Sequence, residues 1–204
     1  MTLSPAFHTV TIAGRDEDLP VIALNDAVAI ALLMVIDRGV AFGTRIGTAL
    51  ADLARPLSPD IVVGPATLGI PVAIEVTRAL GLDDYVILQK SPKIHLADSL
   101  RESVTSVTSH GAQNLMLDRR ALPLLAGRRV FVVDDVASTG SSLAAMLRLL
   151  RRAGAEIIGI GVILTEGHDW KTALGADAAL VMGLAHIPVF RIVNDAAIAI
   201  PETL

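Results

Sequence analysis

Cysteine is absent from this 204-residue sequence, so the chain can form neither disulfide bonds nor thiolate metal sites. Long apolar segments are also lacking. The most apolar stretch, Ala27–Ile36, covers 10 residues, well short of the roughly 20 that cross a bilayer. We predict a buried helix there and no membrane partner. Because Met1–Val10 does not resemble a signal peptide, we expect a cytoplasmic protein.

Positive charge is in deficit, since 17 Lys and Arg residues stand against 21 Asp and Glu residues, for a net charge of −4. Proteins that bind nucleic acids usually carry a basic surplus, so a nucleic-acid partner is not expected. His8, His95 and His110 have no His or carboxylate at metal-ligand spacing. A dedicated zinc site is therefore not expected either.

Aromatic residues make up only 3% of the chain, whereas 52% of it is hydrophobic, mostly Val, Ile, Leu and Ala. These aliphatic residues are typical of parallel sheets covered by helices on both faces. The length fits one domain. We predict a single α/β domain over residues 1–204.

Hydrophobic periodicity predicts an alternation of strands and helices after Pro59, which indicates a twisted parallel sheet of about five strands flanked by helices. The predicted strands are Val10–Ile12, Val21–Leu24, Ile61–Val63, Tyr85–Leu88, Arg129–Val133, Ile157–Leu164 and Ala178–Met182. The predicted helices are Asp26–Asp37, Phe42–Leu53, Pro71–Leu80 and Ser142–Arg152.

One polar segment, Lys90–Asp118, interrupts this alternation. Within it, Ser103–Ser109 alternates Val with Ser or Thr, as a solvated β-hairpin does. Because the segment shows no apolar anchors, we predict a flexible hairpin flap that becomes ordered only when ligands bind.

The segment Val130–Ser142 carries the clearest chemical signal. A hydrophobic strand is followed by Asp134 and Asp135 and then by small or hydroxylated residues up to Ser142, before an amphipathic helix. Backbone N–H groups and hydroxyls at such a helix start can bind a phosphate. Two carboxylates would repel a bare phosphate by roughly 1 to 4 kcal/mol per charge pair, so a sugar must separate them. We predict a ribose 5-phosphate site. The sequence has neither a P-loop nor a Gly-x-Gly-x-x-Gly pattern.

These residues resemble a known family. Val132–Ser142 is similar to the phosphoribosyl pyrophosphate (PRPP) signature of type I phosphoribosyltransferases. The resemblance implies that Asp134 and Asp135 bind the ribose hydroxyls, that magnesium bridges the pyrophosphate, and that the protein is a homodimer. It assigns the 5-phosphate to Ala137, Ser138, Thr139, Gly140, Ser141 and Ser142.

The resemblance extends over most of residues 60–193. It implies a pyrophosphate loop at Pro65, Ala66, Thr67, Leu68 and Gly69, without the Arg often found there. Leu88–Lys93 is similar to the cationic segment of adenine and xanthine phosphoribosyltransferases, with Gln89 in place of an Arg and with Lys90 and Lys93 as the remaining cations. Residues 96–109 and Gly159–Ile163 most resemble the xanthine enzymes and the purine-operon repressors. A small hood is expected from about residues 1–25 and 184–204, and the flap from about 90–118.

Three residues are candidates for contact with a base. Glu166 and Trp170 follow a predicted strand, at the edge where open α/β sheets bind ligands, and His186 precedes the hood. Glu166 is the nearest candidate for orienting or deprotonating a purine, and Trp170 is either a stacking platform or a packing residue. Ser138 stands where hypoxanthine-guanine enzymes carry a third acid, which disfavours that specificity.

The resemblance therefore implies a purine phosphoribosyltransferase of adenine or xanthine type that joins a base to PRPP, releases pyrophosphate and serves nucleotide salvage. Lys90 and Lys93 would stabilise the leaving pyrophosphate, with Glu166 at the base. Two alternatives stay open. One is a PRPP-binding regulatory protein without catalysis, which Gln89 and the Arg-less loop favour. The other is a transferase for a pyrimidine or a thiamine-related base.

Overall fold

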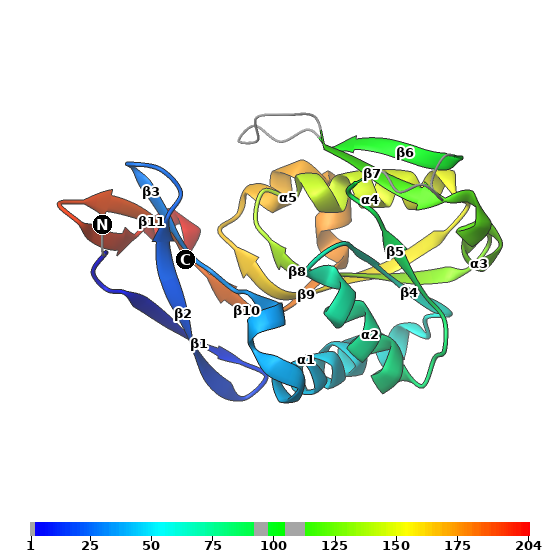
Figure 1. The fold of residues 1–204 in the computed structure, drawn as a ribbon, viewed down its shortest axis with the longest axis horizontal. Helices are drawn as coiled ribbons and strands as arrows, with labels where there is room; N and C mark the ends of the chain where they lie inside the picture. Colours follow the sequence, from blue (N-terminus) through cyan, green and yellow to red (C-terminus); the bar gives the residue numbers. More distant parts are fainter. Residues whose placement is uncertain (1–2, 92–97, 105–112) are drawn as a thin grey trace.

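A five-stranded parallel sheet forms the centre of the computed structural model, which describes residues 3–91, 98–104 and 113–204 (Figure 1). The strand order is β10-β9-β8-β4-β5, and all neighbours are parallel. The strands are β4 (Ile61–Pro65), β5 (Tyr85–Leu88), β8 (Arg129–Ala137), β9 (Glu156–Glu166) and β10 (Val181–Ile187). The predicted parallel sheet is confirmed.

Helices cover both faces of this sheet (Figure 1). Side chains of a strand alternate between its faces, so Phe131 and Val133 pack with α1 (Gly39–Ala54) and α2 (Gly69–Leu80). Val130 and Val132 pack on the other side. The elements there are α3 (Leu122–Leu125), α4 (Ser141–Arg152) and α5 (Asp169–Leu174). Both faces of the sheet are thus buried, as its continuous apolar strands require.

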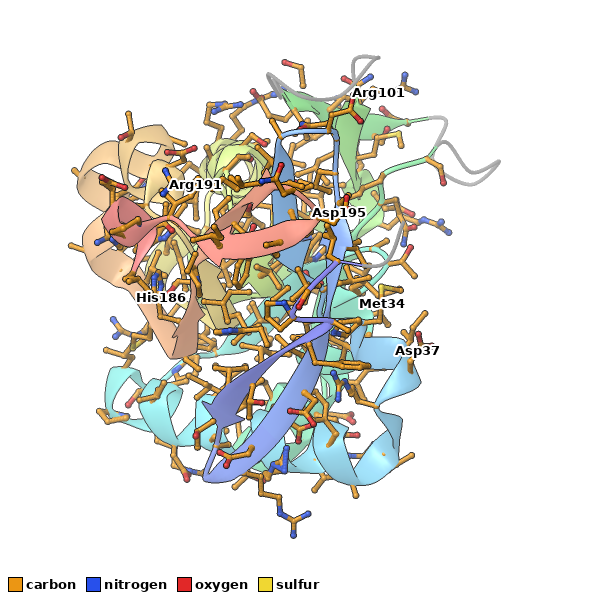
Figure 2. All side chains as sticks on the ribbon, turned by 90° about the vertical axis from the view of Figure 1, so that its left-hand side faces the viewer. Met34, Asp37, Arg101, His186, Arg191 and Asp195 are labelled. Atoms are coloured by element: carbon orange, nitrogen blue, oxygen red, sulfur yellow. The ribbon has the colours of Figure 1, made fainter. Side chains whose placement is uncertain are left out.

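A second sheet combines the two ends of the chain, and we call it the hood sheet. Its order is β1-β2-β3-β11-β12, with antiparallel neighbours. The strands are β1 (Phe7–Ile12), β2 (Arg15–Ala23), β3 (Val28–Ala31), β11 (Val189–Val193) and β12 (Ala196–Ala199). Figure 2 looks at the molecule from this side, where Arg191 and Asp195 lie on the hood sheet. Because β10 keeps to the parallel sheet as far as Ile187, the C-terminal part of the hood sheet begins after that residue.

The predicted helix Asp26–Asp37, with its buried core Ala27–Ile36, is wrong. Asn25 Oδ1 accepts hydrogen bonds from the backbone N–H groups of Ala27 and Val28, both at 2.9 Å, and this closes a tight turn after β2. The turn sends the chain back as β3, and a short 3₁₀ helix, Val35–Asp37, follows. A short apolar run suits a buried strand as well as a helix, and here pairing with β2 and β11 decides.

The predicted strand Ala178–Met182 is displaced, because a 3₁₀ helix, Gly175–Leu180, occupies its first half and β10 begins at Val181. Further 3₁₀ helices are Arg55–Leu57, Arg119–Ala121 and Pro201–Thr203.

The polar insertion forms a two-stranded hairpin from β6 (Ser99–Val104) and β7 (Gln113–Asp118). The expectation that it lacks apolar anchors is wrong for this stem, since Leu115 and Leu117 are fully buried in the core formed with α4. Glu102 also pairs with Arg148 at 2.8 Å and with Arg152 at 2.9 Å on that helix. The predicted arm Ser103–Ser109 lies mostly outside the described residues.

Candidate functional site

The acid pair lies at the carboxyl end of β8, in the middle of the parallel sheet, where open α/β sheets bind ligands. Asp134 is only 6% exposed, and its Oδ1 accepts the backbone N–H of Asp135 at 2.9 Å. Burial raises the pKa of Asp134 well above its ordinary value, and the charge of Asp135 acts in the same direction. The charge of Lys90 opposes both effects.

Gly140 lets the loop after β8 turn into α4. Its φ is +75°, in the left-handed region that favours glycine, and a Cβ atom there would come within 2.8 Å of Trp170 Cα. The hydroxyls of Thr139 and Ser141 lie 3.0 Å apart at the helix start. The loop is therefore a tight backbone turn that aims N–H groups and hydroxyls at one place, as an anion site requires.

The loop and the acid pair enclose a cavity of about 180 Å³, which we call the small cavity. Its lining is formed by Lys90, Asp134, Asp135, Val136, Ala137, Ser138, Thr139, Gly140, Ser142 and Leu143. The structure thus brings together the residues that the sequence assigned to a ribose 5-phosphate, except Ser141, which does not line the small cavity, and it places Lys90, just after β5, beside them. Lys93 lies outside the described residues.

The segment Pro65–Gly69 joins β4 to α2 beside the acid pair. A Cβ atom on Gly69 would come within 2.5 Å of the Pro65 ring and 3.4 Å of Asp134 Oδ1. Ala66 N–H donates to Leu88 O at 2.8 Å, which ties the segment to the end of β5. Position 69 therefore requires glycine, because a side chain there would collide with the Pro65 ring and displace the loop beside the acid pair.

A larger cavity, of about 730 Å³, lies between the hood sheet and the parallel sheet, and we call it the large cavity. Its lining from the hood side is Leu24, Asn25, Ile30, Ala31, Leu32 and Leu33. Its lining from the core side is Leu68, Asp135, Val136, Ser138, Thr139 and Glu166. Four of these residues, Asp135, Val136, Ser138 and Thr139, also line the small cavity, so the two cavities share a wall.

Glu166 is buried in the wall of the large cavity, 6% exposed, and accepts a hydrogen bond from Ser138 Oγ at 2.5 Å. Burial raises the pKa of Glu166, and the hydrogen bond from Ser138 opposes that shift. A carboxylate in this position offers an acceptor to a ligand in the cavity.

Two predicted base contacts do not line the large cavity. Trp170 is buried in the core beside α4, and its Nε1–H donates to Gly167 O at 3.0 Å. His186 bonds Thr165 Oγ1 at 2.9 Å through Nδ1 and Thr203 O at 2.7 Å through Nε2. Trp170 supports the loop from behind through its contact at Gly140, and His186 connects β10 to the C-terminal turn.

Sequence reasoning missed the hood wall of the large cavity. Leu24, Asn25 and Ile30–Leu33 fell near or within the wrongly predicted helix. The signal that could have found them is Asn25-Asp26, since Asn and Asp favour turns directly after a strand.

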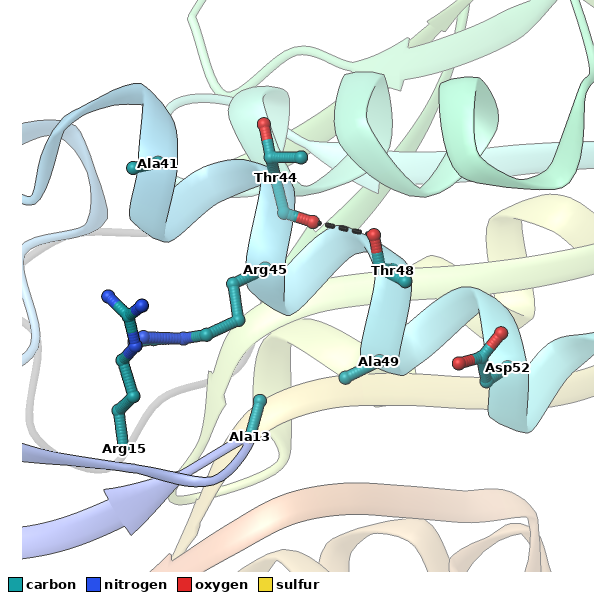
Figure 3. A pocket seen from close by; sticks show the side chains of 8 residues that line it. All are labelled: Ala13, Arg15, Ala41, Thr44, Arg45, Thr48, Ala49 and Asp52. Carbon is teal, nitrogen blue, oxygen red and sulfur yellow. Dashed lines mark hydrogen bonds between the residues drawn. The ribbon is translucent and has the colours of Figure 1, made fainter.

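A third cavity, of about 720 Å³, shares no lining residue with these two and lies on α1 beside the β1–β2 turn (Figure 3). Thr48 Oγ1 donates to Thr44 O there at 2.9 Å, and Arg15 and Arg45 extend toward the same side of the helix (Figure 3). Arg45 is paired with Glu17 of β2, so this region joins the hood sheet to α1.

The acid pair suits a magnesium ion that arrives with its ligand. In the described ranges, no three or more His, Asp or Glu side chains gather as a metal site. Mg²⁺ is usually held by one or two carboxylates together with substrate oxygens and water. Asp134 and Asp135 can provide the carboxylates. No helix in the described part of the chain is long and apolar enough to span a membrane.

An acid pair and a small-residue loop at the carboxyl edge of a parallel α/β sheet, opposite a hood sheet, are the features with which the comparisons with known proteins have to agree. Residues 36–179 match the family model for the phosphoribosyl transferase domain. The chain therefore belongs to the type I phosphoribosyltransferase family.

The chain is similar to several members of this family. It is 34% identical over 130 residues to adenine phosphoribosyltransferase of Oenococcus oeni, covering 64% of this chain and 70% of that protein. It is 32% identical over 126 residues to orotate phosphoribosyltransferase of Caldanaerobacter subterraneus, covering 62% of this chain and 54% of that protein. The fold matches the adenine phosphoribosyltransferase of Saccharomyces cerevisiae, solved with adenine, with a TM-score of 0.66 at 19% identity over 89% of this chain and 96% of that one.

Proposed function

We propose that this protein transfers the 5-phosphoribosyl group of PRPP to a purine of adenine or xanthine type, releasing pyrophosphate. One observation carries the proposal: the small and large cavities share a wall formed by Asp135, Val136, Ser138 and Thr139. A ribose 5-phosphate in the first and a base in the second would meet at ribose C1, where the new bond forms.

The small cavity would hold the ribose 5-phosphate. Backbone N–H groups and hydroxyls of Ala137–Ser142 would bind the phosphate at the start of α4. Asp134 and Asp135 would accept hydrogen bonds from the ribose hydroxyls, which keeps the phosphate away from the carboxylates. Both roles follow from the order of acid pair, loop and helix.

Pyrophosphate would lie toward Pro65–Gly69 and Lys90, which flank the acid pair. The bond from C1 to the pyrophosphate oxygen breaks with its electron pair on that oxygen, while a ring nitrogen of the base donates a lone pair to C1 and loses its proton. Lys90, with Lys93, would stabilise the charge on the leaving group. Magnesium bound at the acid pair would neutralise pyrophosphate charge.

Glu166 would contact the base, because it is the buried acid of the large cavity. It would orient the base or accept the proton that the base loses. The magnesium requirement, assembly as a homodimer and a cytoplasmic location belong to this proposal through the family resemblance.

The proposal is tested by incubating the protein with PRPP and magnesium and offering adenine, xanthine, guanine, hypoxanthine and orotate in turn. We expect pyrophosphate release with at least one purine. Replacing both Asp134 and Asp135 by Asn should weaken PRPP binding by roughly 1.5 to 3 kcal/mol for each carboxylate, measured by calorimetry.

Asp84→Asn is the matched control, because Asp84 is exposed and precedes β5 at its amino end. It should bind PRPP as the wild type does. PRPP binding without pyrophosphate release for any base would indicate a regulatory protein, and unchanged PRPP affinity of the double variant would remove the site altogether.

A further inference from the structure

The inner end of the large cavity is formed by Glu166 at the end of β9 and Ser138 in the loop after β8. Ser138 Oγ donates a hydrogen bond to Glu166 Oε2 at 2.5 Å, and this bond holds the carboxyl group in one orientation. The other oxygen, Oε1, has no hydrogen-bond donor in the described part of the chain. Oε1 is not fully buried, so it is free to accept a hydrogen bond from a ligand in this cavity.

None of the other described lining residues donates a hydrogen bond to Oε1, and most of them are apolar. Ile30–Leu33, Leu68 and Val136 are apolar, and none of the described lining residues is Lys, Arg or His. Asn25 is exposed at the mouth, and its Oδ1 already accepts two backbone N–H groups of the hood turn. Asp135 adds a second carboxylate to the wall. A ligand with an anionic group therefore meets acids and no cation within this cavity.

We infer that the Ser138–Glu166 pair determines which base the site accepts. The pair selects aminopurines, which present an amino group to Glu166, over bases that present a carbonyl oxygen or a carboxylate there. The inference rests on the proposed function and narrows its substrate. An exocyclic amino group donates to Glu166 Oε1, whereas a carbonyl oxygen would place two acceptors against each other without a proton between them. A base carboxylate would add charge repulsion in a buried site.

Adenine and hypoxanthine provide the direct test, because they share one ring system and differ at C6, an amino against an oxo group, and at N1, which carries a proton only in hypoxanthine. We expect kcat/KM for adenine to exceed that for hypoxanthine at least tenfold, and no turnover of orotate. Glu166→Gln places an amide donor at the same position, so it should lower the adenine-to-hypoxanthine ratio at least tenfold while KM for PRPP stays within twofold.

Ser138→Ala should shift the ratio in the same direction by less, because the carboxylate keeps its charge and loses only the group that orients it. Glu156→Gln is the matched control: Glu156 is exposed at the opposite end of β9, and its loss should leave the ratio as in the wild type.

Two results would overturn the inference while leaving the proposed function intact: pyrophosphate release with a wild-type preference for hypoxanthine or orotate, or an unchanged ratio in Glu166→Gln. If no base is turned over, the proposed function fails, and calorimetry of adenine and hypoxanthine on the PRPP-loaded protein still decides the selectivity. Equal affinity for the two bases would then reject the role of the Ser138–Glu166 pair.

Discussion

At the scale of single residues, glycine decides the shape of the phosphate loop. Gly140 has a φ of +75° and lies against Trp170, so it meets two separate requirements, a left-handed backbone and the absence of a side chain. Gly81, at the end of α2, has the same φ of +75° but has no atom within 4 Å of an added Cβ. The two glycines allow the two requirements to be separated.

Gly140→Ala should destabilise the fold by roughly 3 kcal/mol and weaken PRPP binding at least tenfold, because the loop must move away from Trp170. Gly81→Ala should cost only about 1 to 2 kcal/mol, the price of the backbone conformation alone, and leave PRPP binding unchanged. Urea denaturation measures the stability of the two variants, and calorimetry measures their affinity for PRPP. Equal stability losses with equal PRPP affinities would show that the contact with Trp170 has no role in shaping the loop.

At the scale of elements, an ion-pair group attaches the hood sheet to the core. Glu17 of β2 bonds Arg38 at 3.1 Å and also pairs with Arg45 of α1, and the three side chains are only 17–22% exposed. Arg38 further donates to Asp18 O at 2.8 Å. Since the large cavity lies between the hood sheet and the parallel sheet, these bonds help to fix its width.

Glu17→Gln should destabilise the protein by about 1 to 3 kcal/mol, because it leaves two half-buried arginines without their shared carboxylate. It should also raise KM for the base more than KM for PRPP, since the PRPP site lies wholly on the parallel sheet. Asp16→Asn is the control, because Asp16 is exposed and accepts only from Thr11, so a change within about 0.5 kcal/mol is expected. Equal effects of the two substitutions, by urea denaturation, would contradict this view.

At the scale of the whole molecule, the site lowers the stability of the fold. Because burial raises the pKa of Asp134 in the folded state above its unfolded value, the folded protein binds that proton more tightly. The resulting stabilisation is complete below the unfolded pKa and is lost as the pH rises through the folded pKa. Above the folded pKa the buried, charged carboxylate is therefore a cost that function retains.

Asp134→Asn should raise the free energy of unfolding at a pH above the folded pKa of Asp134, while weakening PRPP binding. The gain should shrink as the pH falls into the range where Asp134 becomes protonated in the wild type. Thermal unfolding of both proteins across a series of pH values, with Asp84→Asn as an exposed control, measures it. A stability difference between variant and wild type that does not change with pH would contradict the prediction.

The local order of residues determined the parallel sheet and the phosphate site. Asp134, Asp135 and the loop to Ser142 are contiguous, and a strand that ends where a helix starts places them together whatever the rest of the chain does. The continuous apolar strands likewise require burial on both faces, which only a layered α/β fold provides.

The base side depended on tertiary structure. The hood lining of the large cavity comes from the N-terminal part of the chain, and pairing of β3 with β11 near the C-terminus holds that strand in place. No local pattern encodes that pairing. Residues 26–37 suited a helix by themselves, but Val28–Ala31 became strand β3 because β2 and β11 offered backbone hydrogen bonds on both sides. Glu166 and Trp170 are four positions apart but lie in different surroundings. Trp170, on α5, packs in the core beside α4, whereas Glu166, at the end of β9, lies in the cavity wall beside Ser138. Contiguous residues determined the small cavity, the proposed sugar-phosphate site, and long-range packing determined the large cavity, the proposed base site.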